Sequence, residues 1–229
     1  MKLAIVIPAY NEQESLGRVL SSLPKKLDGI DEIKTIVVDD GSRDRTSEVA
    51  RWNKAIIVKH IVNLGVGAAT KTGLEAAKKL NADIAVTVDA DGQHDTADIV
   101  RLIQPIIDKG YDVAIGSRIY NAQQMPMLKV FGNLFMNFLT FLVFWQWMKD
   151  SQSGMKAFSK NALGKINLHS TGYEICSEII GEIKRNKLKF QEIPIKTIYS
   201  DYSKSRGQDY LNGINIFTRI FFIRINAIK

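Results

Sequence analysis

Two aspartates, Asp89 and Asp91, have the residue type and the spacing that suit metal chemistry. They directly follow an apolar run, Asp83 to Val88, that has the character of a buried strand. Side chains two residues apart on an extended chain point to the same side, so both carboxylates can approach one hard cation, Mg²⁺ or Mn²⁺. Such a cation would bridge a diphosphate and neutralise the charge on a leaving nucleoside diphosphate, and Gln93 could add an oxygen ligand. The alternative is turn chemistry alone, because aspartate is common where a strand enters a loop.

Three more carboxylates stand at similar junctions. Asp39 and Asp40 end a second apolar run, where one of them could accept a hydrogen bond from a nucleobase N–H. Either could instead cap the helix that follows, a task that Ser42 or Asp44 could share. Glu12 also has two interpretations: it contacts a ribose and base, or it interacts with the N-terminal end of a helix dipole.

A glycine-containing segment, Gly65-Val-Gly67-Ala-Ala-Thr70, offers a competing interpretation, because it follows a strand and opens a helix like a dinucleotide-binding loop. It lacks the third glycine of that motif and comes after the third strand rather than the first. Two carboxylates of metal-binding type follow it instead of one ribose-binding acid. A hydride-transferring enzyme is therefore disfavoured.

The elements that must position these residues alternate along the chain. Apolar runs typical of buried parallel strands cover 2–7, 34–38, 55–61, 83–88 and 112–115, and helical patterns cover 12–23, 43–51, 66–80 and 96–109. This alternation predicts an α/β fold with a doubly wound, Rossmann-like, mostly parallel sheet flanked by helices. Ligands bind such sheets at the carboxyl ends of the strands, which is where the polar residues above fall.

Beyond Arg118 the pattern changes. A long apolar helix is predicted at 130–148, a polar loop at 150–154, a helix at 173–186 and a short strand at 192–199. No linker separates this part of the chain from the first, so we predict a single domain, 1–229.

Six segments of the chain occur in a recognisable order. They are Pro8-Ala-Tyr-Asn-Glu12, Val38-Asp-Asp-Gly-Ser42, Asn63-Leu-Gly-Val-Gly-Ala-Ala69, Asp89-Ala-Asp-Gly-Gln-His94, Gly116-Ser-Arg118 and Asp150-Ser-Gln-Ser-Gly154. In this order they resemble the motifs of family 2 glycosyltransferases, in particular the dolichyl-phosphate mannose or glucose synthase branch, over nearly the whole chain. Each motif is weak alone, but six in order are a specific signal.

The resemblance implies a GT-A fold, an inverting mechanism, and Mg²⁺ or Mn²⁺ held by Asp89, Asp91 and Gln93. The nucleotide-sugar-binding residues that it implies are Pro8, Tyr10, Glu12, Asp39, Asp40, Ala90 and Gln93. The implied catalytic residues are Asp91, Arg118 and Asp150, and the implied contacts of an acceptor phosphate are Arg118, Lys129, Lys204 and Arg206. On this basis the domain would comprise a nucleotide-sugar half (1–118), an acceptor half (119–206) and an amphipathic C-terminal helix (207–229).

One stretch departs from the pattern of the branch. Ser200 and Asp201, rather than an arginine, precede the pair Ser203-Lys204. Lys204 and Arg206 would therefore have to supply the charge that the missing arginine provides to the acceptor phosphate.

The nature of the acceptor decides what Asp150 must do. A phosphate is already ionised at neutral pH and needs no base, whereas a hydroxyl acceptor would need a carboxylate near the anomeric carbon, for which Asp150 is the candidate. Its structural alternative is to cap its loop or to bond Arg118. The leading prediction is transfer of a hexose or N-acetylhexosamine from a UDP- or GDP-sugar, with a slight preference for UDP, to a polyprenyl or dolichyl phosphate. The alternatives are a family 2 enzyme that glycosylates a sugar hydroxyl, and an inactive nucleotide-sugar-binding membrane module.

The apolar segment 130–148 contains no charged residue and has the marginal length of a membrane span. A single crossing between Asp91 and Asp150 would, however, divide the proposed site between two sides of a membrane. Polar residues also recur in it at helical spacing. They are Asn133, Asn137 and Thr140. We therefore predict an interfacial amphipathic helix, with Trp145 and Trp147 near the lipid headgroups; the alternative is a buried core or dimer helix.

The composition narrows the class of partner. The net charge of +7 suits nucleic acid, anionic lipid or a phosphorylated substrate, but no recognition-helix or stacking pattern favours nucleic acid. The basic amphipathic stretch 210–229 favours anionic lipid. The single cysteine, Cys176, is expected to be a packing residue. The segment Leu3 to Pro8 lacks the features of a signal peptide, so we expect a cytoplasmic protein that associates peripherally with the inner face of the membrane; a homo-oligomer is an open alternative.

Overall fold

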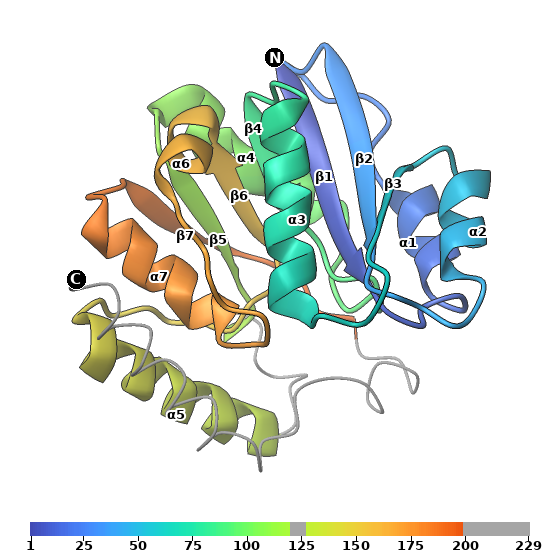
Figure 1. Cartoon of the computed structure of the whole chain (residues 1–229). Coiled ribbons are helices and arrows are strands. Elements are labelled where there is room, and N and C mark those ends of the chain that lie inside the picture. The colour runs from blue at the N-terminus through green and yellow to red at the C-terminus, as the bar shows by residue number, and fades with distance from the viewer. Residues whose placement is uncertain (120–126, 199–229) are drawn as a thin grey trace.

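The computed structural model describes residues 1–119 and 127–198, without the side chains of 127–129. Within these residues, a sheet of seven strands has the order β3-β2-β1-β4-β6-β5-β7 (Figure 1). The strands are β1 (Lys2–Ala9), β2 (Glu32–Asp39), β3 (Ile56–Lys59), β4 (Ile84–Thr87), β5 (Val113–Ser117), β6 (Lys156–Ser159) and β7 (Phe190–Pro194). Neighbouring strands are parallel except that β6 runs antiparallel to β4 and β5. The predicted mostly parallel α/β sheet is confirmed.

Helices cover both faces of this sheet. They are α1 (Leu16–Ser22), α2 (Thr46–Trp52), α3 (Val66–Lys79), α4 (Asp98–Lys109), α5 (Met127–Phe144), α6 (Lys160–Lys165) and α7 (Ile175–Arg185). Figure 1 shows α3, α6 and α7 in front of the sheet and α1, α2 and α4 behind it.

Strand β1 shows why the sequence forms this sandwich. Ala4 and Val6 pack in the core cluster that includes α3, α6 and α7, whereas Leu3, Ile5 and Ile7 pack in the cluster that includes α1, α2 and α4. Successive side chains of a strand point to opposite faces, so a strand with a helix layer on each face must be apolar throughout. The continuous apolar run that predicted β1 follows from this two-sided burial.

The structure corrects several sequence-based bounds. Strand β6 and helix α6 were not predicted, because β6 begins with a lysine, ends with a serine and forms no continuous apolar run. Strand β7 was expected at 192–199 but covers Phe190–Pro194; Thr197 instead forms an isolated bridge with His94. The strand expected at 55–61 and the helices expected at 43–51 and 173–186 are likewise shifted or shorter at their ends.

Two helices also differ from expectation. Helix α1 begins at Leu16 rather than at Glu12, because the intervening residues form a turn in which the Glu12 carbonyl accepts hydrogen bonds from the N–H groups of Ser15 and Leu16. Helix α5 ends at Phe144 rather than at Met148, because Trp145 adopts a left-handed backbone conformation with a φ of 53°. The helix predicted at 207–229 lies outside the described residues.

None of the helices described in 1–119 and 127–198 combines the length and the apolar character that crossing a membrane requires.

Candidate active site

The two aspartates of the predicted metal site lie where the sheet changes direction. The chain leads from β1 outward to β2 and β3, and then returns to the other side of β1 with β4. The loops that follow β1 and β4 therefore leave the same edge side by side, and Val88 N–H donates to the Val6 carbonyl over 2.9 Å. Such a switch point is where doubly wound sheets bind ligands. Asp89 and Asp91 follow β4 at this point, as predicted.

Each of these aspartates has one oxygen held by the protein. Asp89 Oδ2 lies 3.0 Å from His94 Nε2, and Asp91 Oδ1 accepts a hydrogen bond of 2.9 Å from the Gln93 backbone N–H. Within the described residues, Asp89 Oδ1 and Asp91 Oδ2 accept no hydrogen bond. Two carboxylate oxygens are thus left for a ligand.

The pKa values of Asp89 and Asp91 are shifted in opposite directions. Burial and the negative charge of Asp89 raise the pKa of Asp91 to about 6. Burial also acts to raise the pKa of Asp89, but the hydrogen bond from His94 and the positive charges of Arg118 and Lys156 outweigh it, so the pKa of Asp89 is lowered. Two carboxylates that repel each other in this way would be stabilised by a cation placed between them.

The donor set fits a divalent ion that is shared with a diphosphate. Among the described residues there is no cluster of three or more His, Cys, Asp and Glu arranged to hold a metal. Mg²⁺ in enzymes is commonly bound by one or two carboxylates together with substrate phosphates and water. Asp89 and Asp91 provide that number of carboxylates, so phosphate oxygens of the substrate would complete the coordination.

Asp39 and Asp40 are buried and already bonded within their own loops. Asp40 accepts hydrogen bonds from the N–H groups of Leu64 (2.9 Å) and Gly65 (2.8 Å), and it lies 2.6 Å from His60 Nδ1. Asp39 accepts a hydrogen bond of 2.8 Å from the N–H of Ser42 and another from the Ser47 hydroxyl. Both carboxylates thus hold the loops after β2 and β3 in place, and their predicted contact with the nucleotide stays a prediction.

The remaining residues of the predicted nucleotide site lie around the same edge. Glu12 is 8% exposed, and its carboxylate accepts a hydrogen bond of 2.5 Å from the Ser15 hydroxyl. Tyr10 is more open, at 38% exposed, and Ala90 is buried. Pro8 lies near the end of β1, next to these residues. The structure therefore brings the predicted nucleotide-binding residues to one edge of the sheet.

The two glycines of the segment 65–70 have a packing role. The N–H of Gly67 donates to the Thr171 carbonyl over 2.7 Å, and a Cβ at Gly67 would lie 2.7 Å from the carbonyl oxygens of Ser170 and Gly172. A Cβ at Gly65 would lie 2.4 Å from the Thr171 oxygen. Close approach of two backbones explains both glycines, so they do not require a dinucleotide phosphate.

Arg118 and Asp150 form a buried ion pair at the end of β5. Asp150 is fully buried, and its Oδ2 accepts hydrogen bonds from Arg118 N–H (2.9 Å) and Nε–H (2.8 Å). Its Oδ1 accepts from Arg118 Nη2 (2.8 Å) and from Asn133 Nδ2 (3.1 Å). Although burial acts in the opposite sense, the Arg118 charge and hydrogen bonds lower the pKa of Asp150 to about 2. Asp150 therefore fixes the orientation of the Arg118 guanidinium. This bond to Arg118 is the structural role that the sequence offered as an alternative for Asp150.

The other predicted phosphate contacts cannot be placed. The side chain of Lys129, and all of Lys204 and Arg206, lie outside the described residues.

Two residues that sequence reasoning did not select lie near the acid pair. Lys156 on β6 is 1% exposed; its Nζ donates to the Ser153 carbonyl and lies 3.6 Å from Cys176 Sγ. Tyr173 precedes α7, and its pKa is raised by burial and by the charges of Asp89 and Asp91, so its hydroxyl lies within the field of the pair. No local pattern could have indicated Lys156, because the strand that carries it was itself not predicted.

Helix α5 turns polar side chains toward the rest of the domain. Asn137 Nδ2 donates to the Lys149 carbonyl over 2.5 Å, and Asn137 Oδ1 accepts from the N–H and the hydroxyl of Ser151 over 2.8 and 2.7 Å. The hydroxyls of Thr140 and Ser177 lie 2.8 Å apart, which links α5 to α7. Met136, Leu139 and Val143 are also buried on this side. The polar stripe of the sequence is therefore an internal one.

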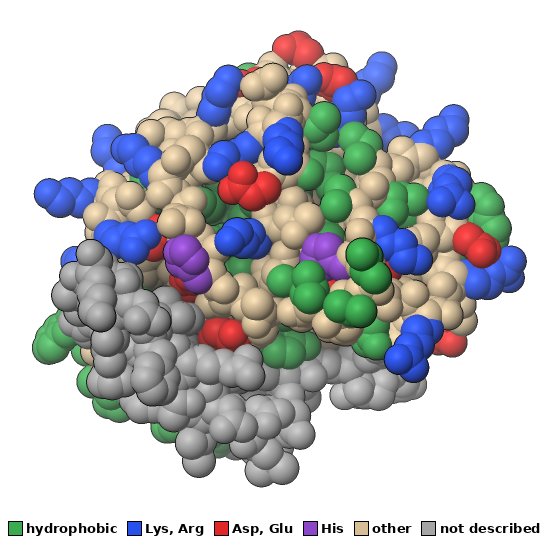
Figure 2. All heavy atoms as spheres, in the orientation of Figure 1, with side chains coloured by type: hydrophobic (Ala, Val, Ile, Leu, Met, Phe, Trp, Pro, Cys, Tyr) green, Lys and Arg blue, Asp and Glu red, His purple; other side chains and the backbone are tan. Residues whose placement is uncertain are grey.

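The opposite face of α5 and the turn after it are apolar and exposed. Seven side chains there are 45 to 65% exposed: Phe131, Leu134, Phe135, Phe138, Leu142, Trp145 and Trp147. Figure 2 shows hydrophobic side chains at the lower left of this view, where Figure 1 places α5. The helix thus carries large apolar residues on its outer face as well as on its inner one, which is unusual for a helix on the surface of a domain.

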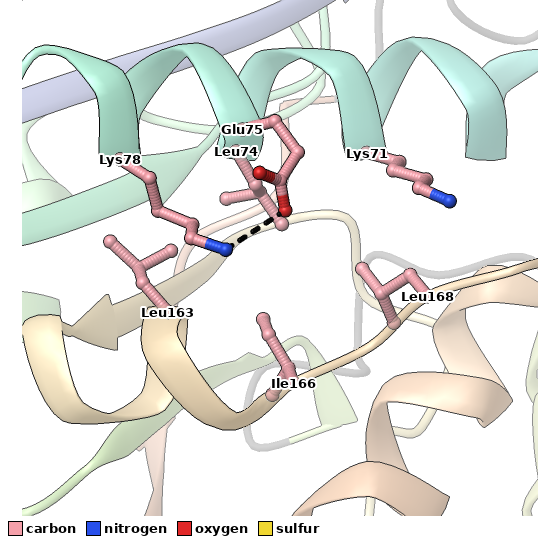
Figure 3. A pocket seen from close by; sticks show the side chains of 7 residues that line it. All are labelled: Lys71, Leu74, Glu75, Lys78, Leu163, Ile166 and Leu168. Carbon is pink, nitrogen blue, oxygen red and sulfur yellow. Dashed lines mark hydrogen bonds and ion pairs between the residues drawn. The ribbon is translucent and has the colours of Figure 1, made fainter.

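A shallow groove lies away from the acid pair, between α3 and α6 (Figure 3). Its lining residues are Lys71, Leu74, Glu75, Lys78, Leu163, Ile166 and Leu168. The Lys78 ammonium and the Glu75 carboxylate, 3.1 Å apart, bond to each other at its rim. None of the predicted site residues contributes to this groove, so it has no part in the site.

Comparison with known proteins agrees with this geometry. Residues 4–166 match the family model described as glycosyl transferase family 2. The chain is 42% identical over 246 residues to the UDP-N-acetylglucosamine–dolichyl-phosphate N-acetylglucosaminyltransferase of Methanococcus voltae, covering 98% of this chain and 96% of that relative. It is 30% identical over 226 residues to the dolichol-phosphate mannosyltransferase of Pyrococcus furiosus, covering 95% of this chain and 61% of that relative.

A solved structure shares the fold. The crystal structure of glucosyl-3-phosphoglycerate synthase from Mycobacterium tuberculosis in complex with Mn²⁺, UDP and phosphoglyceric acid has a TM-score of 0.71 and 19% identity, covering 99% of this chain and 78% of that one.

The sheet, with its acid pair at the switch point, defines the GT-A class of glycosyltransferase folds. Within that class, the match over residues 4–166 shows that the chain belongs to glycosyl transferase family 2, so it is a glycosyltransferase. Its relatives include dolichyl-phosphate sugar transferases, the branch that the sequence motifs resemble.

Proposed function

We propose that this protein transfers a hexose or N-acetylhexosamine from a UDP- or GDP-sugar to a polyprenyl or dolichyl phosphate, with inversion at the anomeric carbon. A UDP-sugar is preferred, because the Methanococcus voltae relative is named for a UDP-linked donor. The reaction takes place at the switch point of the sheet, between the loops that follow β1 and β4.

Asp89 and Asp91 would hold Mg²⁺ or Mn²⁺ through Asp89 Oδ1 and Asp91 Oδ2, with Gln93 close by. When bound, the ion would neutralise the charge that develops on the leaving nucleoside diphosphate. The protein holds these carboxylates in position through the contacts of His94 and of the Gln93 backbone. Tyr10 and Glu12, from the loop after β1, would contact the nucleoside.

The burial and the hydrogen bonds of Asp150 are the observation that favours a phosphate acceptor. Its two oxygens accept hydrogen bonds from Arg118 and Asn133, and it is fully buried. A carboxylate in this state, with a pKa of about 2, is a poor base for removing a proton from a sugar hydroxyl. An acceptor phosphate needs no base, since it is already ionised, but it needs a cation. Asp150 orients such a cation in Arg118, whose side chain is 19% exposed.

The exposed apolar face of helix α5 supports peripheral association with the inner face of the membrane. Large apolar side chains in water are unfavourable by about 25 cal/mol per Å², and seven of them line the outer face of α5 and the turn after it. Trp145 and Trp147 have the amphipathic rings typical of the headgroup region. On its inner side, α5 reaches the Arg118–Asp150 pair through Asn133. A bilayer against the outer face would therefore bring a lipid phosphate near Arg118.

The reaction is tested by transfer of labelled sugar from a panel of UDP- and GDP-sugars to polyprenyl phosphate in detergent, with Mg²⁺ or Mn²⁺. Label should enter the lipid only with metal, and Asp91→Asn should abolish transfer. Arg118→Ala should abolish transfer while UDP still binds. Normal transfer by Arg118→Ala would remove the phosphate-acceptor assignment, and labelling of a glycan hydroxyl instead would favour the polysaccharide or glycolipid alternative.

A further inference from the structure

The carboxylate of Asp89 is enclosed from two sides by residues that the reaction itself does not use. On one side is the His94 ring, 2% exposed, whose Nε2 lies 3.0 Å from Asp89 Oδ2. On the other is Gly154, where an added Cβ would lie 2.2 and 2.4 Å from the two carboxylate oxygens of Asp89. The Asp89 side chain is still 38% exposed, so its remaining side is open to a ligand.

We propose that His94 and Gly154 form a clamp that holds Asp89 in the rotamer able to bind a metal, and that His94 is a positioning residue for the ion. This inference rests on the proposed metal-dependent transfer, and it gives a role to two residues that are not themselves proposed metal ligands.

The hydrogen bond has a defined direction. An ionised carboxylate can only accept, so Nε2 carries the proton and donates to Oδ2. Nδ1 of the same ring is buried and has no hydrogen-bond partner within the described part of the chain. The ring is therefore held by its packing and by the contact with Asp89. With Oδ2 engaged, Oδ1 is the oxygen of Asp89 that is left for a cation.

The backbone around the clamp is fixed as well. His94 pairs with Thr197 in an isolated β-bridge. The Gly154 carbonyl accepts a hydrogen bond of 2.7 Å from the Thr87 hydroxyl at the end of β4, two residues before Asp89. The Gly154 side of the clamp is thus tied to the strand that leads to Asp89, and the His94 side is tied to Thr197.

Partners that orient metal ligands affect metal affinity by about 10- to 100-fold. Loss of the donor should let Asp89 sample other rotamers, so the ion should bind more weakly. Once the site is saturated with metal, the same coordination forms, and turnover should largely recover. The clamp therefore predicts a change in the Mn²⁺ requirement rather than in kcat.

The test is titration of the metal-free protein with Mn²⁺ in the presence of UDP, followed by electron paramagnetic resonance or calorimetry. His94→Leu should weaken Mn²⁺ binding about 10- to 100-fold, whereas His94→Gln, which restores an N–H donor, should lie much closer to the wild type. Gly154→Ala should weaken binding in the same direction. His169→Leu, at an exposed histidine outside the site, is the matched control and should leave the Mn²⁺ affinity unchanged.

The outcomes separate the clamp from the proposed function. If the wild type binds Mn²⁺ and His94→Leu binds it equally well, the clamp is wrong and metal-dependent transfer stands. If His94→Gln is as impaired as His94→Leu, the hydrogen bond is not the cause and the clamp is again overturned. If His94→Leu does not fold, His94→Gln and Gly154→Ala still decide the question. If the wild type binds no Mn²⁺ with UDP present, both proposals fail.

Discussion

Helices α4 and α5 lie in the same domain but differ in what their buried and exposed faces contain. In α4, the buried face includes Ile99, Leu102, Ile103 and Ile106. In α5, the buried face combines hydrogen-bonding side chains with apolar ones, and the exposed face carries large apolar residues. The buried residues are Asn133, Asn137, Thr140, Met136, Leu139 and Val143.

This difference indicates which surface each helix contacts. Burial of apolar area stabilises α4 on the sheet by about 1.5 to 3 kcal/mol for each large side chain. Helix α5 is held by hydrogen bonds to the loop 149–151 and to α7 together with a small buried apolar cluster, and the large apolar residues of its outer face are left for a surface outside the domain. Both helices bury apolar side chains in the fold, but only α5 also has a continuous outer face of large apolar residues.

The largest effect is expected from removing the polar fastening of α5. Asn137→Leu would leave the Lys149 carbonyl and the N–H and hydroxyl of Ser151 without their partner. Each unsatisfied buried group costs about 1 to 3 kcal/mol, so the free energy of unfolding should fall by about 4 kcal/mol. Urea denaturation followed by circular dichroism measures this change. A loss below about 1 kcal/mol would mean that α5 is not held by these bonds.

The second effect contrasts apolar residues on the two helices. Leu102→Ala on α4 removes a fully buried side chain and should lower the free energy of unfolding by about 3 kcal/mol. Leu142→Ala on α5 removes one that is 45% exposed and should change it by less than about 0.5 kcal/mol. Equal losses in the two variants, measured by urea denaturation, would show that the outer face of α5 is packed in solution.

The third effect concerns the ion pair beneath α5 and depends on pH. Because the pKa of Asp150 falls from 3.8 in the unfolded chain to about 2, its ionised form contributes about 2 kcal/mol of stability. The unfolded chain binds more protons between these values, so this contribution is full above about pH 4 and is lost as the pH falls toward 2.

Asp150→Asn should therefore be less stable than the wild type by about 2 kcal/mol at pH 7, and the gap should shrink between pH 4 and 2. Urea denaturation at several pH values measures it. A gap that does not change with pH would mean that the Arg118–Asp150 contact is not electrostatic in origin.

The smallest effect on stability is expected from exposed apolar residues, where the two helices should differ only in membrane binding. Phe138→Ser on α5 (49% exposed) and Val100→Ser on α4 (47% exposed) should each change the free energy of unfolding by less than about 0.5 kcal/mol. Phe138→Ser should weaken binding to vesicles of phosphatidylcholine and phosphatidylglycerol by about tenfold or more, and Val100→Ser should not.

Co-sedimentation with these vesicles measures the difference, and light scattering gives the oligomeric state. If Phe138→Ser dissociates a dimer and leaves vesicle binding unchanged, the outer face of α5 is a subunit interface instead.

The first half of the fold was predictable because its signals are local. A strand buried on both faces must be apolar along its whole length, so β1, β2 and β4 appeared as continuous runs. Asp89 and Asp91 followed such a run, and the order of parallel strands then required them to lie at the ligand-binding edge. The six motifs led to the family that the comparison confirms.

The second half was less predictable because its signals depend on distant partners. Strand β6 is four residues long, pairs antiparallel between β4 and β5, and begins with the buried Lys156. Strand β4 is equally short but begins with the apolar run Ile-Ala-Val, whereas the sequence Lys-Ala-Phe-Ser of β6 carries no such signal. Its loop brings Gly154 against Asp89, a contact between residues 65 positions apart in the sequence.

The sequence by itself determined the order of the strands and helices from β1 to β5, the positions of the acidic residues at strand ends, and the amphipathic character of α5. Only the tertiary structure decided which face of α5 points inward, that Asp150 is locked onto Arg118, and that His94 and Gly154 enclose Asp89. The physical reason is that periodicity records the two faces of an element but not what lies across from each face. The partners that assign those faces come from parts of the chain far away in sequence.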